Sequence, residues 1–121
     1  MKATDLRIGN YHYYHIEDKF ADPKEWDEVC TIDAEDLVWL SKPEGEADTD
    51  YKPIPLTEER LMEFGFERNG VNTFWKDPMM VVLFPEGALY FANQRFVNLI
   101  YVHQLQNLYF AITGIELTKI K

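Results

Sequence analysis

The chain has 121 residues, the length of one domain, and its 46% hydrophobic content is enough for a packed core and excludes global disorder. Its formal net charge is −9, and 13 acidic against 3 basic residues lie between Glu17 and Asp50. Nucleic-acid binding through phosphate contacts needs clustered Lys and Arg. This acidic chain has no such cluster, so we expect no direct binding to nucleic acid.

The first third of the chain is typical of short strands. The aromatic-rich stretch Leu6–Ile16 predicts a strand, with a bulge at Gly9. Val29–Ile32 and Leu37–Leu40 predict a second and a third strand, separated by a turn at residues 33–36. These opening strands resemble the start of a small SH3-like barrel, which makes a barrel one expectation for this half.

A helix is expected near residues 58–64. Thr57 is a suitable N-cap, the two glutamates that follow favour the positive end of a helix, and Gly65 ends it. A meander of strands follows, and its clearest turn signal is Asn69-Gly70. The continuous apolar run Met79–Phe84 predicts a strand buried on both faces. The alternating stretch Ile115–Ile120 predicts a last short strand.

A second helix is expected near residues 101–113, ended by Gly114 at its C′ position. Its apolar residues fall within one arc, which predicts the core-facing stripe Tyr101, Val102, Leu105, Leu108, Tyr109 and Ile112. The opposite face is neutral, because no Asp, Glu, Lys or Arg occurs from residue 96 to 114. That face carries His103, Gln104, Gln106, Asn107 and Phe110. We keep two interpretations of it: an amide-rich surface or second internal contact, and a surface for a partner or a homodimer.

Acidic side chains form a second candidate partner surface, suited to a basic protein. They belong to the predicted turn at 33–36 and to an expected acidic loop at 41–50: Asp33, Glu35, Asp36, Glu44, Glu46, Asp48 and Asp50. The alternation in the loop is similar to a calcium loop, but the positions that need Gly and Glu hold other residues. We therefore expect a solvated loop without a metal.

No motif commits the chain to a chemistry. His12 and His15 are three apart, so in a strand they point to opposite faces and cannot share an ion. The single cysteine, Cys30, lies in an apolar strand pattern and predicts a buried thiol in a reducing compartment. We find no Gly-rich phosphate loop, CxxC or Gly-x-Ser-x-Gly, and carboxylates occur in charge runs from which no catalytic pair can be chosen. We expect no cofactor.

Compartment and membrane contact can also be inferred. Met1–Arg7 has no apolar run of the signal-peptide kind, so we expect a cytoplasmic protein. The uncharged stretch 96–114 is interrupted by five strongly polar side chains, each of which would need a partner in hydrocarbon. We therefore expect no membrane span.

Several segments across most of the chain are informative when they are taken together: Leu6–Tyr11, Ile32-Asp33, Pro53–Glu59, Phe64–Phe66, Tyr101–Ala111 and Thr113-Gly114, of which Tyr101–Ala111 is the most specific. Together they resemble a family of short uncharacterised proteins of gut bacteria, often found near prophage or mobile elements. The resemblance implies a phage or mobile-element setting and no mechanism.

The sequence therefore predicts a small α+β domain, rich in antiparallel strands, spanning residues 1–121. It divides into two lobes, an acidic β-rich lobe at 1–55 and a helix–meander–helix lobe at 56–121. The expected function is a non-enzymatic protein-interaction module, an accessory protein of a phage or mobile element. The alternative is a small enzyme whose carboxylates converge only in three dimensions.

Overall fold

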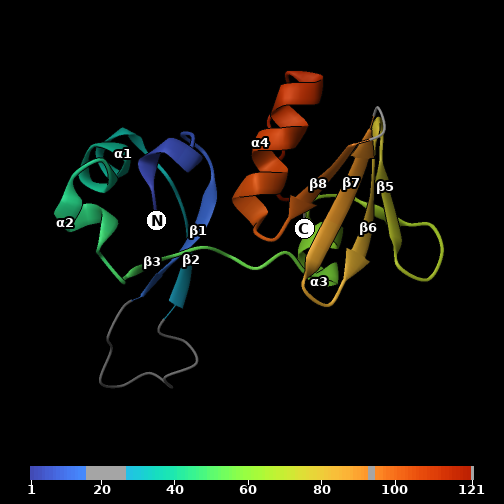
Figure 1. Ribbon diagram of the computed structural model, residues 1–121, viewed down its shortest axis with the longest axis horizontal. Helices are drawn as coiled ribbons and strands as arrows, with labels where there is room; N and C mark the ends of the chain where they lie inside the picture. The colour runs from blue at the N-terminus through green and yellow to red at the C-terminus, as the bar shows by residue number, and fades with distance from the viewer. Residues whose placement is uncertain (16–26, 93–94, 121) are drawn as a thin grey trace. The chain divides into compact units, whose positions relative to one another are not determined.

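The computed structural model describes residues 1–15, 27–92 and 95–120 (Figure 1). The chain forms two compact units, unit 1 (Met1–Ile54) and unit 2 (Pro55–Lys121). Each unit combines helices with one antiparallel sheet. The α+β class with antiparallel strands that the sequence predicts is confirmed.

Unit 1 is built on a three-stranded sheet in the order β2–β1–β3. Its strands are β1 (Tyr11–His15), β2 (Asp27–Thr31) and β3 (Tyr51–Lys52), and a short 3-10 helix, η1 (Ala3–Asp5), precedes them. The expected strand from Leu6 is wrong before Tyr11, because residues 7–10 form a turn in which Gly9 has φ 95°. The Asn10 side-chain oxygen accepts the Arg7 N–H there at 2.6 Å. The described strands form an open sheet and do not close into a barrel.

Helix α1 (Ala34–Leu40) replaces the expected turn at 33–36 and the expected strand at 37–40, so both predictions are wrong. A reciprocal capping box starts it: the Asp33 carboxylate accepts the Asp36 N–H at 2.8 Å, and the Asp36 carboxylate accepts the Asp33 N–H at 2.9 Å. Two helix-terminal N–H groups are thereby satisfied. Leu37 and Leu40 are three residues apart and lie on one helix face, where they join the core around Leu6 and Ile32.

The expected acidic loop at 41–50 contains a one-turn helix, α2 (Pro43–Glu46). Proline suits its first position, where no intrahelical N–H is needed. Asp48 holds the segment to α1, because its carboxylate accepts the Trp39 indole N–H at 3.0 Å and the Asp50 N–H at 2.9 Å. The loop is therefore partly structured by its own acids.

Unit 2 is a helix, a five-stranded meander and a second helix. The strands pair in chain order: β4 (Glu67–Arg68), β5 (Thr73–Lys76), β6 (Met79–Phe84), β7 (Gly87–Ala92) and β8 (Arg95–Leu99). Helix α3 (Glu58–Glu63) precedes the sheet, confirming the helix expected near 58–64. The Thr57 hydroxyl accepts the Arg60 N–H at 3.4 Å, and Gly65 leaves the helix with φ 88°. The left-handed backbone there favours glycine.

Helix α4 (Val102–Thr113) confirms the second expected helix, and Gly114 ends it in the left-handed conformation at φ 73°. The Gln104 side-chain oxygen caps its start by accepting the N–H groups of Ile100 at 2.8 Å and Tyr101 at 3.0 Å. The core stripe is only partly as expected. Val102, Leu105 and Tyr109 are buried, as predicted, whereas Ile112 is 38% exposed.

Two further expectations for unit 2 are wrong. Strand β6 is not buried on both faces: Met79 and Val81 are buried, whereas Met80 and Phe84 are exposed. The tail at 115–120 does not form a strand; Leu117 is buried, and the Ile120 N–H donates to the Glu63 carbonyl at 2.8 Å. Because all six residues of β6 are apolar, their pattern could not indicate which face of the strand is covered.

Candidate interaction surface

The five-stranded sheet of unit 2 has one covered and one open face. Residues directly opposite each other in antiparallel strands point to the same face. On the covered face Phe74 lies opposite Val81 and Ala88 lies opposite Leu99, and all four are buried. We call the other side the outer face. Among the side chains that the structure describes, its apolar residues are Trp75, Met80, Val82, Phe84, Leu89 and Phe96.

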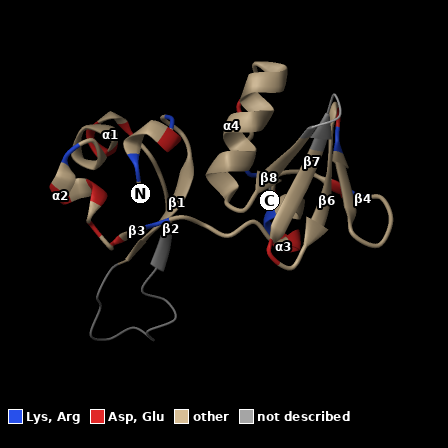
Figure 2. Ribbon diagram, in the orientation of Figure 1, with Lys and Arg blue, Asp and Glu red and all other residues tan. Residues whose placement is uncertain are grey.

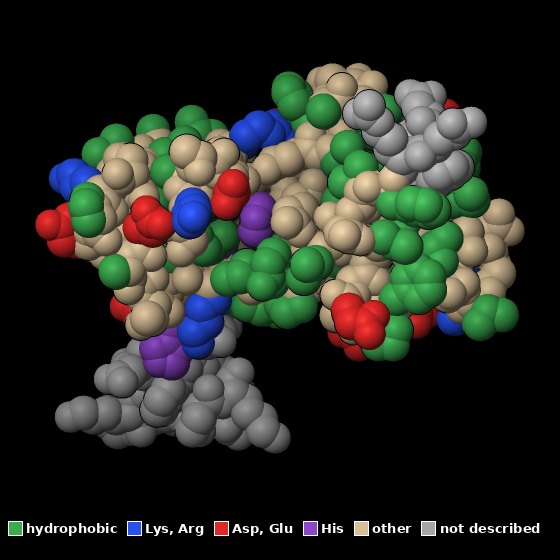
Figure 3. All heavy atoms as spheres, in the orientation of Figure 1, with side chains coloured by type: hydrophobic (Ala, Val, Ile, Leu, Met, Phe, Trp, Pro, Cys, Tyr) green, Lys and Arg blue, Asp and Glu red, His purple; other side chains and the backbone are tan. Residues whose placement is uncertain are grey.

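The outer face exposes large side chains. Trp75 is 40% exposed, Phe84 42% and Phe96 70%. Hydrophobic side chains gather over β6 and β7 in the space-filling view (Figure 3). Contiguous exposed apolar residues of this size are typical of interaction sites, and Trp, Phe and Met are enriched where proteins bind each other.

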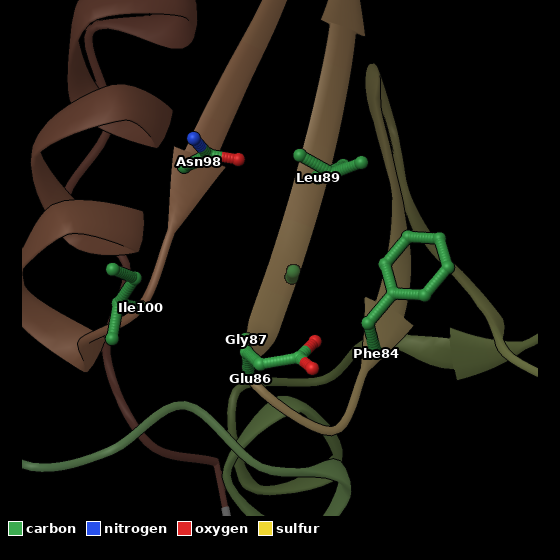
Figure 4. A pocket seen from close by; sticks show the side chains of 7 residues that line it. Phe84, Glu86, Gly87, Leu89, Asn98 and Ile100 are labelled. Atoms are coloured by element: carbon green, nitrogen blue, oxygen red, sulfur yellow. The ribbon is translucent and has the colours of Figure 1, made fainter.

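A hollow of about 420 Å³ lies at one end of the outer face. Its lining includes Phe84 from β6, Leu89 from β7, Asn98 from β8 and Ile100 just beyond it (Figure 4). Glu86, in the turn between β6 and β7, contributes a carboxylate that is directed towards the Phe84 side (Figure 4). The hollow thus combines an apolar floor with one acid and one amide.

The charge of the outer face has one sign in the described residues. Glu67 lies opposite Trp75 on this face, and Glu86 borders the hollow. Arg68 is on the covered side: its guanidinium lies 5.9 Å from the centre of the Phe74 ring and donates to the Val71 carbonyl at 2.7 Å. A partner for the outer face would meet apolar surface bordered by carboxylates.

The acids predicted as a partner surface divide into two groups in unit 1. Asp33, Glu35, Glu44 and Glu46 are exposed on or beside α1 and α2. Figure 2 shows acidic residues in red along these two helices. Asp36, Asp48 and Asp50 are half-buried, and the carboxylates of the first two accept hydrogen bonds that hold α1 and the following segment. The acids from Glu17 to Glu25 lie outside the described residues.

The amide face of α4 is largely internal, in agreement with the second internal contact that was one of its two interpretations. Gln106 is fully buried, and its side-chain amide donates to the Leu117 carbonyl at 3.3 Å; His103 is buried as well and stacks on Tyr101 with ring centres 5.7 Å apart. Gln104 caps the helix, and Asn107 is half-buried. Phe110 alone of the five predicted residues is exposed, at 39%.

A polar cluster in unit 1 joins the sheet to α1. The Tyr51 hydroxyl donates a hydrogen bond of 2.7 Å to the Asp36 carboxylate. The Tyr51 ring stacks on the His12 ring, with ring centres 5.2 Å apart. Burial acts to raise the pKa of Asp36, but hydrogen bonds from Tyr51 and the Asp33 backbone outweigh it and hold that pKa below its usual value. Burial and the bond to Asp36 raise the pKa of Tyr51. These groups therefore stabilise unit 1 with Asp36 ionised.

Cys30 lies opposite His12 in the β1–β2 register, an arrangement that sequence spacing could not reveal. The thiol is half-buried, so the expectation of a buried thiol is wrong. His12 is buried and its Nδ1 lies 3.0 Å from the Tyr13 carbonyl oxygen. Cys30 and His12 therefore belong to the packing of β1 against β2 and β3.

Metal and membrane features can be assessed for the same part of the chain. Among the side chains that the structure describes, no three of His, Cys, Asp or Glu are grouped so that they could hold a metal ion. None of the described helices is both long and apolar enough to span a bilayer.

Comparison of the chain with protein-family models, curated proteins and solved structures gave no match.

Proposed function

We propose that this chain is a cytoplasmic, non-enzymatic protein-interaction module that binds its partner through the outer face of unit 2. The observation that carries the proposal is a sheet face on which four of the six apolar residues named above are exposed. Sheets normally bury an apolar face against another layer. The resemblance to short proteins of gut bacteria adds a phage or mobile-element setting to the proposal.

The chemistry of the hollow favours binding over catalysis. Among the residues that line it, Glu86 is the one titratable side chain, and Asn98 the one amide. General acid–base catalysis needs a positioned group with a matched pKa and a reacting partner. An apolar floor with one acid at its border suits an anchoring side chain of a partner.

The exposed acids of unit 1 have a supporting role in this proposal. Asp33, Glu35, Glu44 and Glu46 give unit 1 a negative surface, which attracts a basic partner and speeds its encounter. Exposed charges contribute modestly to the affinity and are screened by salt. The outer face should therefore set the lifetime of the complex and the acids its rate of formation.

Affinity capture with matched variants tests the proposal. The tagged full chain would be incubated with lysate of its source organism, as wild type, as the double variant Trp75→Ser/Phe84→Ser, and as Val71→Ser. Val71 is 87% exposed in the β4–β5 connection, so its variant controls for the loss of an exposed apolar residue outside the outer face. We expect a protein that wild type and Val71→Ser retain and the double variant loses.

Two outcomes would contradict the proposal. One is a captured protein that all three chains retain equally. The other is capture that the double variant keeps but that neutralising Glu35, Glu44 and Glu46 removes, which would assign the contact to unit 1. An unchanged amide spectrum of each variant would show that the fold is intact.

A further inference from the structure

The dimensions of the outer face match those of one short helix. Strands β6 and β7 have six residues each, which corresponds to a length of roughly 20 Å. Five strands extend over roughly 20 Å in the other direction. A helix about 10 Å wide fits along β6 and β7, and about 13 helical residues cover their length.

The apolar residues of the outer face occur where such a helix would lie. Met80, Val82 and Phe84 alternate along β6, and Leu89 lies opposite Val82 on β7. Trp75 and Phe96 flank this central row from β5 and β8. A helix with a stripe at i, i+3, i+4 and i+7 would contact this row with one face.

The charges of the outer face indicate which side chains a partner helix should carry. The described residues of the outer face carry Glu67 near the β4 edge and Glu86 at the hollow, and no Lys or Arg. A second copy of this chain would present the same acids and the same net charge of −9, so self-association through this face meets like charges. A helix with basic residues on the flank that faces β4 and at the end beside the β6–β7 turn meets opposite charges at both places.

We propose that the outer face seats an amphipathic helix of a partner protein, apolar towards β6 and β7 and basic on the flank near Glu67 and at the end near Glu86. One apolar side chain of the helix enters the hollow beside Phe84, Leu89 and Ile100, and a neighbouring Lys or Arg pairs with Glu86. This inference rests on the proposed function, because it names the partner of the same surface.

A model peptide of the stated chemistry tests this inference directly. The probe is an amidated peptide of about 14 residues in which Leu recurs at i, i+3, i+4 and i+7 and Lys fills the other positions. Its matched control carries Glu in place of Lys. Each would be titrated into the isotope-labelled full chain at about 0.1 M salt, where exposed charge contacts act only over about 10 Å.

The expected result is a set of amide shifts at Val82, Leu89 and Asn98, with the Leu–Lys peptide and not with the Leu–Glu peptide. Phe84→Ser should weaken binding by about tenfold, since truncating a central anchor is costly. Glu86→Gln should weaken it by about twofold to fivefold, the size of an exposed ion pair. Val71→Ser should leave the dissociation constant unchanged.

The inference would be overturned by shifts confined to residues 27–54, by equal binding of the two peptides, or by no binding at millimolar peptide. It would also be overturned if sedimentation showed a dimer that Trp75→Ser dissociates, because the occupant would then be a second copy. If lysate capture depends on Trp75 and Phe84 but the peptide fails, the helix is wrong and the interaction module stands. If capture does not depend on them, the proposed function itself fails.

Discussion

Gln106 lies on helix α4, in the interior of unit 2. Its side chain is fully buried and donates a hydrogen bond of 3.3 Å to the carbonyl of Leu117, which is itself 1% exposed. Gln106→Ala removes that bond and leaves a buried carbonyl unpaired, at a cost of about 1–3 kcal/mol. We expect the free energy of unfolding of unit 2 to fall by that amount, about 1–3 kcal/mol.

Urea unfolding followed through the amide signals of α4 would measure this loss in unit 2 alone. With a slope of about 1–3 kcal/mol per molar urea, the midpoint should fall by roughly 1 M. Ala111→Gln is the matched control, since it adds an amide at an exposed position of the same helix and should change stability by less than about 0.5 kcal/mol. A Gln106→Ala chain within about 0.5 kcal/mol of wild type would refute the buried placement.

Three further predictions concern unit 1. Gly45→Ala should abolish the packing of α2 on α1, because a Cβ at Gly45 would collide with the backbone carbonyl of Trp39; the α2 amide signals should lose their dispersion. Asp33→Ala should destabilise unit 1 by about 0.5–2 kcal/mol, the usual loss for an N-cap, measured by urea unfolding followed through the α1 amide signals, with Glu35→Ala as an exposed control within about 0.5 kcal/mol. The folded-state pKa of Asp36 is lowered, so its contribution is present above the ordinary aspartate pKa and is lost as the pH falls through the folded-state value; Asp36→Asn should make the urea midpoint of unit 1 less sensitive to acid, and an unchanged acid dependence would contradict this.

Sequence patterns predicted the long and well-punctuated elements of unit 2. Helix α4 has three turns of apolar period and a glycine at its end, and α3 has Thr57 before its first turn, so local signals agree with the fold there. Each cap pairs a backbone group with a residue at most four positions away in the sequence. Such local signals do not depend on tertiary contacts, which is why they predict these helices correctly.

The failure at residues 33–40 has a physical cause. Leu37–Leu40 is four apolar residues long, and a run of that length suits a strand or one turn of helix equally. The interaction that favours the helix is the reciprocal cap between Asp33 and Asp36. In a segment rich in Asp and Glu, these two residues could not be distinguished from other exposed acids by sequence alone. The same acids that suggested a partner surface are thus in part the reason why α1 forms.

The open face of the unit 2 sheet could not be predicted, because it depends on which side of a continuous apolar run is covered. Residues 79–84 are all apolar, and nothing local tells Met79 and Val81, which are buried, from Met80 and Phe84, which are exposed. The pairing register with β5 and β7 determines which side chains share a face. It places Trp75 opposite Met80 and Leu89 opposite Val82 on the outer face. Because Ser or Thr on that side would suit solvent better, the large apolar residues there impose a solubility cost in the isolated chain. A bound partner would remove that cost, and this is why the outer face, more than the acids of unit 1, is the surface on which the function is expected to depend.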